Sequence, residues 1–162
     1  MHIELQQAMQ HLVSEHSLNL KEVSRFTPVD FRLGIQYLVA QDQPDLAQAL
    51  AEAGLALYPL SEDILAISGL LAITREDWQL AVEILKDLVS IQNDRVQPMT
   101  YQMLARALAC NLDVAEAHQV LEAALQKWPN DATLLQERNA MAAVQDAMPA
   151  STLTNEFNSQ LN

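Results

Sequence analysis

Apolar residues recur at steps of three and four through most of the chain, and residues 62–95 show this helical spacing most clearly. They predict two helices, at residues 62–74 and 78–91, joined by the polar turn 75–77. One face of the second helix is apolar at Trp78, Ala81, Val82, Leu85, Leu88 and Val89. Further apolar residues lie off that face at Leu80, Ile84 and Ile91. A helix that is apolar on two sides must be covered from two sides, so this hairpin is expected to be an inner unit of a stack.

The same spacing, together with local helix-start signals, predicts further helices before and after this hairpin. Thr27 as N-cap and Pro28 at the first position mark one start, and Asp113 with Glu116 forms a capping box at another. The predicted helices are residues 2–15, 28–40, 44–57, 62–74, 78–91, 98–110, 114–128 and 131 to about 148, with a short helical turn near 19–22.

The predicted fold class is all-α, because no run of alternating β-branched residues is long enough for a strand. Residues 1–148 are expected to form one domain. Residues 149–162 contain few apolar residues and are expected to form a flexible tail.

Charge and cysteine content exclude several classes of function. The chain has 162 residues, a net charge of −12 and a pI near 4.5. Such an acidic surface repels nucleic acid and anionic membranes, so neither is an expected partner. The single cysteine, Cys110, rules out an internal disulfide framework. There is no signal-like start, and the longest uncharged apolar run, residues 64–74, is too short to span a bilayer. We therefore expect a cytoplasmic protein.

The three hairpins of residues 28–130 carry matching residues at a regular interval. Their second helices have a small residue at equivalent places, 34 and 36 residues apart, at Ala47, Ala81 and Ala117. Twelve residues after these alanines come Pro59, Asn93 and Pro129. Small residues allow two helices to cross closely, and a period near 34 residues is typical of stacked helical hairpins.

This pattern resembles the tetratricopeptide repeat, whose first helix carries an aromatic residue, Leu-Gly and a second aromatic, and whose second helix carries Ala, an aromatic and Pro. The first copy has Leu33, Gly34, Tyr37, Ala47 and Pro59, the second has Leu65, Gly69, Ala81 and Leu85, and the third has Tyr101, Leu104, Ala105, Leu108, Ala117, Leu121 and Pro129. The resemblance implies a right-handed stack of three repeats, about residues 28–61, 62–97 and 98–130, with an N-terminal helix and a capping helix at 131–148. The alternative is an ordinary antiparallel bundle without superhelical curvature. In size and architecture the chain also resembles the chaperones of type III secretion translocators.

The sequence has no arrangement of residues that is expected of an enzyme. The three glycines lie within predicted helices, where close packing explains them, and none belongs to a phosphate-binding loop. No pair of histidines has the i, i+4 spacing of a helical metal site. Cys110 has no histidine or basic residue nearby, so a buried or half-buried thiol is expected rather than a nucleophile. We therefore expect no catalytic residue, no cofactor and no metal ion.

A binding surface is better indicated. In tetratricopeptide stacks the first helix of each hairpin lines a concave groove, and the resemblance implies which residues lie there. These expected partner-binding residues are Phe31, Ile35, Leu38, Ala66, Leu70, Ile73, Met99, Gln102 and Arg106. They are apolar over two repeats, so a protein segment with apolar anchors is the expected partner. In the alternative interpretation, some of them belong to the core or lie under the N-terminal helix.

The terminal helices raise two further expectations. The N-terminal helix carries Leu5, Met9 and Leu12 on one face, which either packs on the first hairpin or forms a homodimer contact. The last helix is expected to bury Leu134 and to place Glu137 on its outer side.

Together these observations predict a non-enzymatic adaptor or chaperone that holds a segment of another protein in an apolar groove. The alternative is a structural component whose apolar helix faces serve self-assembly or a fixed place in a larger complex.

Overall fold

The computed structural model describes residues 3–15 and 20–147, and these ranges are helical and contain no strand. This confirms the predicted all-α class. The helices are α1 (Ile3–Glu15), α2 (Leu20–Val23), α3 (Pro28–Ala40), α4 (Pro44–Leu57), α5 (Glu62–Thr74), α6 (Trp78–Gln92), α7 (Pro98–Cys110), α8 (Val114–Lys127) and α9 (Ala132–Ala147), with a short 3-10 helix η1 (Asn93–Arg95) after α6. The predicted bounds agree with these to within about two residues. The expected helix ends at His2 and Met148 and the expected tail 149–162 lie outside the described residues.

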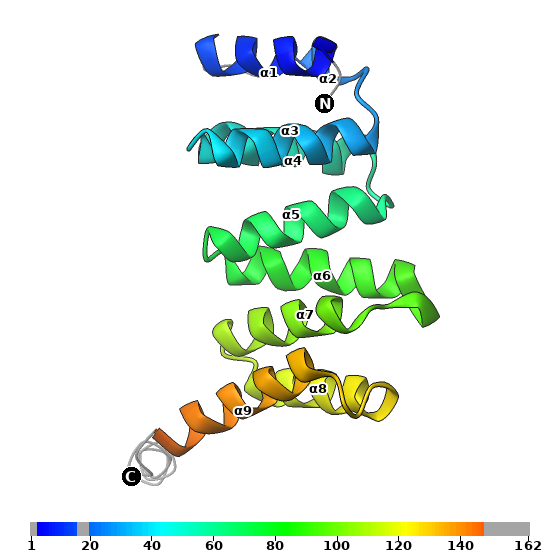
Figure 1. Ribbon diagram of the computed structural model, residues 1–162, viewed down its shortest axis with the longest axis vertical. Coiled ribbons are helices and arrows are strands. Elements are labelled where there is room, and N and C mark those ends of the chain that lie inside the picture. Colours follow the sequence, from blue (N-terminus) through cyan, green and yellow to red (C-terminus); the bar gives the residue numbers. More distant parts are fainter. Residues whose placement is uncertain (1–2, 16–19, 148–162) are drawn as a thin grey trace, which may run out of the picture.

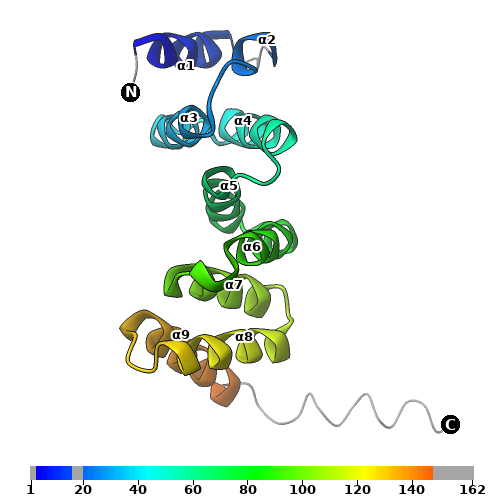
Figure 2. The ribbon, with the colours of Figure 1, turned by 90° about the vertical axis from the view of Figure 1, so that its right-hand side faces the viewer.

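The helices form an elongated stack of antiparallel hairpins. The pairs α3–α4, α5–α6 and α7–α8 each form one hairpin, and each hairpin packs on the next (Figure 1). Figure 2 shows two columns, with α3, α5, α7 and α9 in one and α4, α6 and α8 in the other. Helix α1 covers α3 at one end, and α9 packs on α7 and α8 at the other. Helix α5 contacts α3, α4, α6 and α7, so the central hairpin is covered from both sides as its apolar pattern predicts.

Two clusters of buried residues fill the stack. One joins α1, α3, α4 and part of α5 around Met9, Leu50 and Ile64. The other extends from α5 to α9 around Leu85 and Leu121. Because both clusters include residues of α5, the packing is continuous from one end of the stack to the other.

Small residues lie where helices cross, as their spacing in the sequence predicts. Ala47, Ala81 and Ala117 are completely buried. A Cβ atom added at Gly69 of α5 would lie 2.9 Å from Cδ2 of Leu85 on α6, which is inside the van der Waals contact distance. Glycine within a helix costs about 0.5–1 kcal/mol relative to alanine. The close approach of Leu85 explains why this position nevertheless lacks a side chain.

The turn inside each hairpin has the same backbone conformation. Asp42, Glu76 and Leu112 have positive φ angles of 56°, 59° and 69°. They are 34 and 36 residues apart, like the alanines. In each turn the next amide donates a 2.9 Å hydrogen bond back into the first helix, from Gln43 to Leu38, Asp77 to Ala72 and Asp113 to Leu108. These bonds belong to the Schellman motif, which satisfies free carbonyl groups at a helix C-terminus. The motif could not be predicted from the sequence, because its residue with positive φ is usually glycine and none of these turns contains glycine.

The second helix ends differently in the central hairpin. Tyr58 and Trp128 end α4 and α8 with φ angles of −134° and −129°. At the corresponding end of α6, Asn93 has a φ of 50° and η1 follows. This places Nη2 of Arg95 2.6 Å from Oε1 of Glu62, and that hydrogen bond is the main reason why the pKa of Glu62 is lowered. The different ending of α6 occurs at Asn93, the position at which the other two hairpins have proline.

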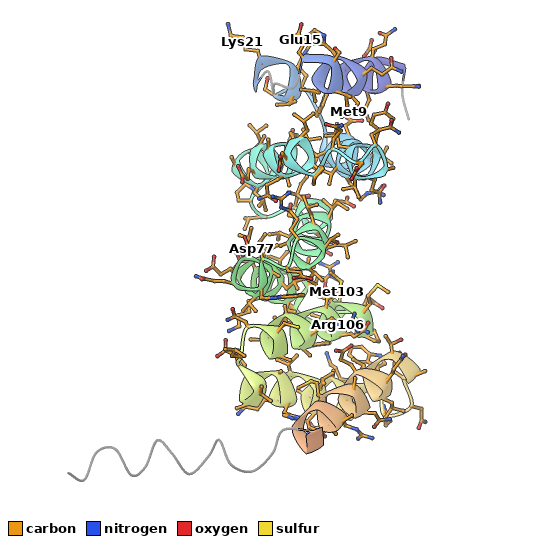
Figure 3. The ribbon with its side chains drawn as sticks, turned by 90° about the vertical axis from the view of Figure 1, so that its left-hand side faces the viewer. Met9, Glu15, Lys21, Asp77, Met103 and Arg106 are labelled. Carbon is orange, nitrogen blue, oxygen red and sulfur yellow. The ribbon has the colours of Figure 1, made fainter. Side chains whose placement is uncertain are left out.

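The N-terminal helix packs on the first hairpin and does not present its apolar face to a second copy. Leu5, Met9 and Leu12 are buried inside the monomer, and Met9 lies between α1 and α3 (Figure 3). A Cβ atom added at Gly34 of α3 would lie 2.9 Å from Sδ of Met9. The expected homodimer contact through Leu5, Met9 and Leu12 is therefore corrected, because these side chains are already covered by α3.

In the described ranges, no helix combines the length and the apolar character that crossing a membrane requires.

Candidate functional site

The candidate site lies on the column of first helices, α3, α5 and α7, which we call the first-helix face. Each of these helices has 13 residues, so positions correspond when the helices are aligned by their first residues, Pro28, Glu62 and Pro98. The exposed side chains then correspond as well. At the ninth position, Gln36, Leu70 and Arg106 are all exposed.

The structure corrects three of the expected partner-binding residues. Phe31, Ile35 and Leu38 have 0% exposure, so their side chains offer no open surface to a partner. The Phe31 ring packs edge-on against Phe26 and Tyr58, with ring centroids 5.8 and 6.0 Å apart. These residues belong to the core, as the alternative interpretation proposed.

Alignment by the helix starts identifies the residues of α3 that do lie on the first-helix face. They are Val29, Arg32, Gln36 and Val39. These lie 34 residues before Asp63, Ala66, Leu70 and Ile73 of α5, respectively. All four are exposed or partly exposed. The signal for this register was present in the sequence, because Pro28 and Glu62 begin their helices and are 34 residues apart.

The remaining expected residues occupy the first-helix face, although with different exposure. Ala66 and Ile73 of α5 are partly buried, and Leu70 between them is 47% exposed. On α7, Met99 is 64% exposed, and Gln102 is partly buried.

An apolar hollow lies between α3 and α5, which we call the α3–α5 groove. Its volume is about 170 Å³, and it is lined by Ile35, Gln36, Val39, Ile67, Leu70, Leu71 and Thr74. The floor is buried at Ile35, Ile67 and Leu71, whereas Val39 and Leu70 are 45% and 47% exposed. A branched apolar side chain that is half-exposed beside an apolar floor can bury further area against a ligand.

An ion pair connects the two helices beyond one end of the groove. Nε of Arg32 on α3 lies 3.3 Å from Oδ1 of Asp63 on α5. Asp63 is in the first turn of α5. The groove residues Leu70 and Thr74 are in its second half. The pair therefore lies on the side of the groove away from the turn that joins α5 to α6.

At the third hairpin, α9 packs against α7 and contacts its part of the first-helix face. Glu137 of α9 accepts hydrogen bonds from Nη2 of Arg106 at 2.6 Å, from Nε of Arg106 at 3.2 Å and from Nε2 of Gln102 at 3.1 Å. The hydrogen bond with Glu137 is the main cause of the raised pKa of Arg106. Two of the expected partner-binding residues thus have a partner inside the protein.

The position of Glu137 contradicts the expectation that it faces outward. Its side chain is only 7% exposed. A buried carboxylate is costly unless it is paired, and the guanidinium of Arg106 supplies the pair. Sequence reasoning missed this contact because α7 and α9 are separated by a whole helix along the chain.

Cys110, at the end of α7, also differs from the expectation. The residue is exposed and not buried or half-buried. The pKa of its thiol is nevertheless raised, mainly by partial burial, and the opposing effect of Arg106 is countered by Glu137 and Glu76. A raised pKa reduces the thiolate fraction at neutral pH, so this thiol is not activated for attack.

A second hollow, of about 480 Å³, lies beside α1 and is lined by both polar and apolar residues, among them Glu4, His11 and Phe26. Over the part of the chain that the structure describes, no group of three or more His, Cys, Asp or Glu side chains is placed to hold a metal ion.

No protein-family model and no curated protein matches the chain.

Proposed function

We propose that this protein is a non-enzymatic protein-binding module of the tetratricopeptide-repeat type. Three hairpins with first helices of equal length support the proposal, as do the buried alanines at Ala47, Ala81 and Ala117. The Schellman turns repeat with the same intervals of 34 and 36 residues. In an ordinary helical bundle, a turn with positive φ is not expected to recur at the same intervals as the buried alanines.

The module binds a segment of another protein in the α3–α5 groove and acts as an adaptor or chaperone. The observation that carries this function is the pair Val39 and Leu70, which remain half-exposed above the buried floor of the groove. Most apolar residues of α5 are covered by neighbouring helices, so Leu70 is the exception on an otherwise covered helix. A role in type III secretion is the specific setting that the size and architecture suggest.

The test replaces Leu70 by glutamate. If Leu70 faces an open groove, Leu70→Glu leaves the helical circular dichroism spectrum unchanged, because the carboxylate stays in water. Partner retention in pull-downs from the native host should fall, since central apolar anchors often contribute about 2 kcal/mol or more to binding. A matched control is Leu60→Glu, which makes the same change at a residue that is 76% exposed and outside the groove.

Two results would contradict the proposal. If the Leu70→Glu protein folds and retains the same partners as Leu60→Glu, the groove does not take part in partner binding. A large closed assembly that Leu70→Glu dissociates, measured by light scattering after size exclusion, would instead favour the structural role in which the groove serves self-assembly.

A further inference from the structure

One end of the α3–α5 groove lies near an edge of the stack that carries negative charge. Val39 and Thr74, which line the groove, lie near the C-terminal ends of α3 and α5. The turns that follow, residues 41–43 and 75–77, lie on the same edge as the third turn, residues 111–113. We call this edge the turn edge, and Figure 3 faces it, with Asp77 labelled.

Acidic residues predominate on the turn edge. The three turns contain Asp42, Glu76, Asp77 and Asp113, all exposed, and one cation, Arg75. Nη1 of Arg75 lies 3.5 Å from Oδ1 of Asp45, so this cation already faces a carboxylate.

The helix termini add little net charge to this edge, because three C-termini and three N-termini meet there. The C-terminal ends of α3, α5 and α7 reach the turn edge, and none of these helices has a basic residue in its last turn. Each C-terminus carries a partial negative charge that a cation would offset. The starts of α4, α6 and α8 lie at the same edge and carry a matching partial positive charge, so the charged side chains determine the net charge of the edge.

An acidic residue of the turn edge lies close to the α3–α5 groove. Glu76 lies in the turn after α5, two residues beyond the groove residue Thr74. On the other side of the groove, the two acidic residues in the first turn of α5 are both paired with cations, Asp63 with Arg32 at 3.3 Å and Glu62 with Arg95 at 2.6 Å. The groove is therefore electrically asymmetric along its length.

From this asymmetry we propose that the partner segment in the α3–α5 groove has its apolar anchors followed, on one side only, by lysine or arginine residues that lie over the turn edge. This inference rests on the proposed function and adds the chemistry of the partner to it. The anchors contact Val39 and Leu70, and the basic residues face Asp42, Glu76 and Asp77. Such an arrangement selects the orientation of the segment, because the reversed segment would place its cations beside the neutral Arg32–Asp63 pair.

The experiment measures the binding of fluorescein-labelled peptides by anisotropy. All peptides share a core of two leucines, one helical turn apart, in a background of alanine and glutamine. In one pair the core is followed by lysines or by glutamates, and in a second pair the same charges precede it. We expect one lysine peptide to bind at least about tenfold more tightly than its glutamate counterpart at low salt, and this difference should shrink at 1 M salt, where the Debye length is about 3 Å.

Two variants separate the charge from the groove. The edge variant, Asp42→Asn with Glu76→Gln and Asp77→Asn, removes three negative charges. It preserves the turns, because asparagine tolerates the positive φ at position 42 and is a good N-cap at position 77, and glutamine has the same shape as the glutamate it replaces at position 76. Its control, Glu52→Gln with Asp87→Asn and Glu122→Gln, removes the same charge from exposed residues of α4, α6 and α8. The edge variant should lose most of the preference for lysine, whereas the control should keep it.

The outcomes distinguish this inference from the proposed function. If lysine and glutamate peptides bind equally, or if the edge variant and its control weaken binding equally, the inference is overturned. If Leu70→Gln still abolishes peptide binding in that case, the groove function stands. If no peptide binds and Leu70→Glu also keeps its partners in pull-downs, both fail. A dimer that Leu70→Gln dissociates would show that a second copy fills the groove, and it would overturn the inference.

Discussion

The crossing of α5 and α6 at Gly69 and Leu85 provides a quantitative test of the packing. Leu85 is completely buried, so Leu85→Ala should lower the free energy of unfolding by about 2–5 kcal/mol. Gly69→Ala gains about 1 kcal/mol from helix propensity. It also places a methyl group 2.9 Å from Cδ2 and 3.1 Å from Cγ of Leu85. Overpacking of this kind costs about 1–3 kcal/mol, and full burial leaves Leu85 little room to move. The single change Gly69→Ala should therefore be neutral or destabilising by up to about 2 kcal/mol.

The double variant carries the specific prediction. When Leu85 is shortened to alanine, the overlap with the new methyl group disappears and that methyl group enters the cavity. One buried methylene is worth about 0.8 kcal/mol, and relief of the overlap adds to it. The double variant should thus be about 2–4 kcal/mol more stable than the sum of the single effects predicts, at or above the upper end of the usual range for residues in contact.

The assay is urea denaturation of the four proteins of the cycle, followed by far-ultraviolet circular dichroism. A second cycle combines Gly69→Ala with Leu121→Ala, which removes an equally buried leucine from α8 in the next hairpin. That cycle should be additive to within about 0.5 kcal/mol. If the Gly69–Leu85 cycle is additive to the same degree, the two residues are not in contact, and the close crossing of α5 and α6 is refuted.

Three further predictions test other parts of the structure. Leu112→Gly should raise the free energy of unfolding by about 0.5–1 kcal/mol, because glycine tolerates the φ of 69° that leucine does not, whereas Leu112→Ala should have little effect in the same urea assay. Deletion of residues 1–15 should increase the binding of an apolar dye, because it uncovers the face of α3 around Gly34; unchanged dye binding would mean that α1 does not cover α3. The hydrogen bond from Arg95 lowers the pKa of Glu62 in the folded state, so the stabilisation it provides is present above the unfolded-state pKa and is lost as the pH falls through the folded-state pKa. Glu62→Gln should therefore lower the urea midpoint at pH 7 but not at pH 2, and an equal difference at both values would exclude this linkage.

Helix positions could be predicted from the sequence because their signals are local. Oγ1 of Thr27 accepts a hydrogen bond from the amide of Asp30, and the carboxylate of Asp30 accepts one from the amide of Thr27, as the residue types at this spacing predict. Pro28, Pro44 and Pro98 begin α3, α4 and α7, where the missing amide hydrogen costs nothing. The stacking of hairpins was also predictable, because a helix that is apolar on two sides has to be covered from two sides.

The residues of the candidate site could not all be predicted from the sequence, because their exposure depends on contacts between distant parts of the chain. Phe31 and Ile35 are apolar residues of α3 that suit a groove and a core equally well, and the packing of neighbouring elements buries them. Glu137 is an acidic residue that a single helix would place in water, but Arg106, 31 residues earlier, draws it into the stack. Hydrophobic spacing identifies an apolar face without identifying what covers it. The exposure of Leu70 and Val39 therefore results from where α3 and α5 stand relative to their neighbours, and only the packed arrangement of all the helices determines that.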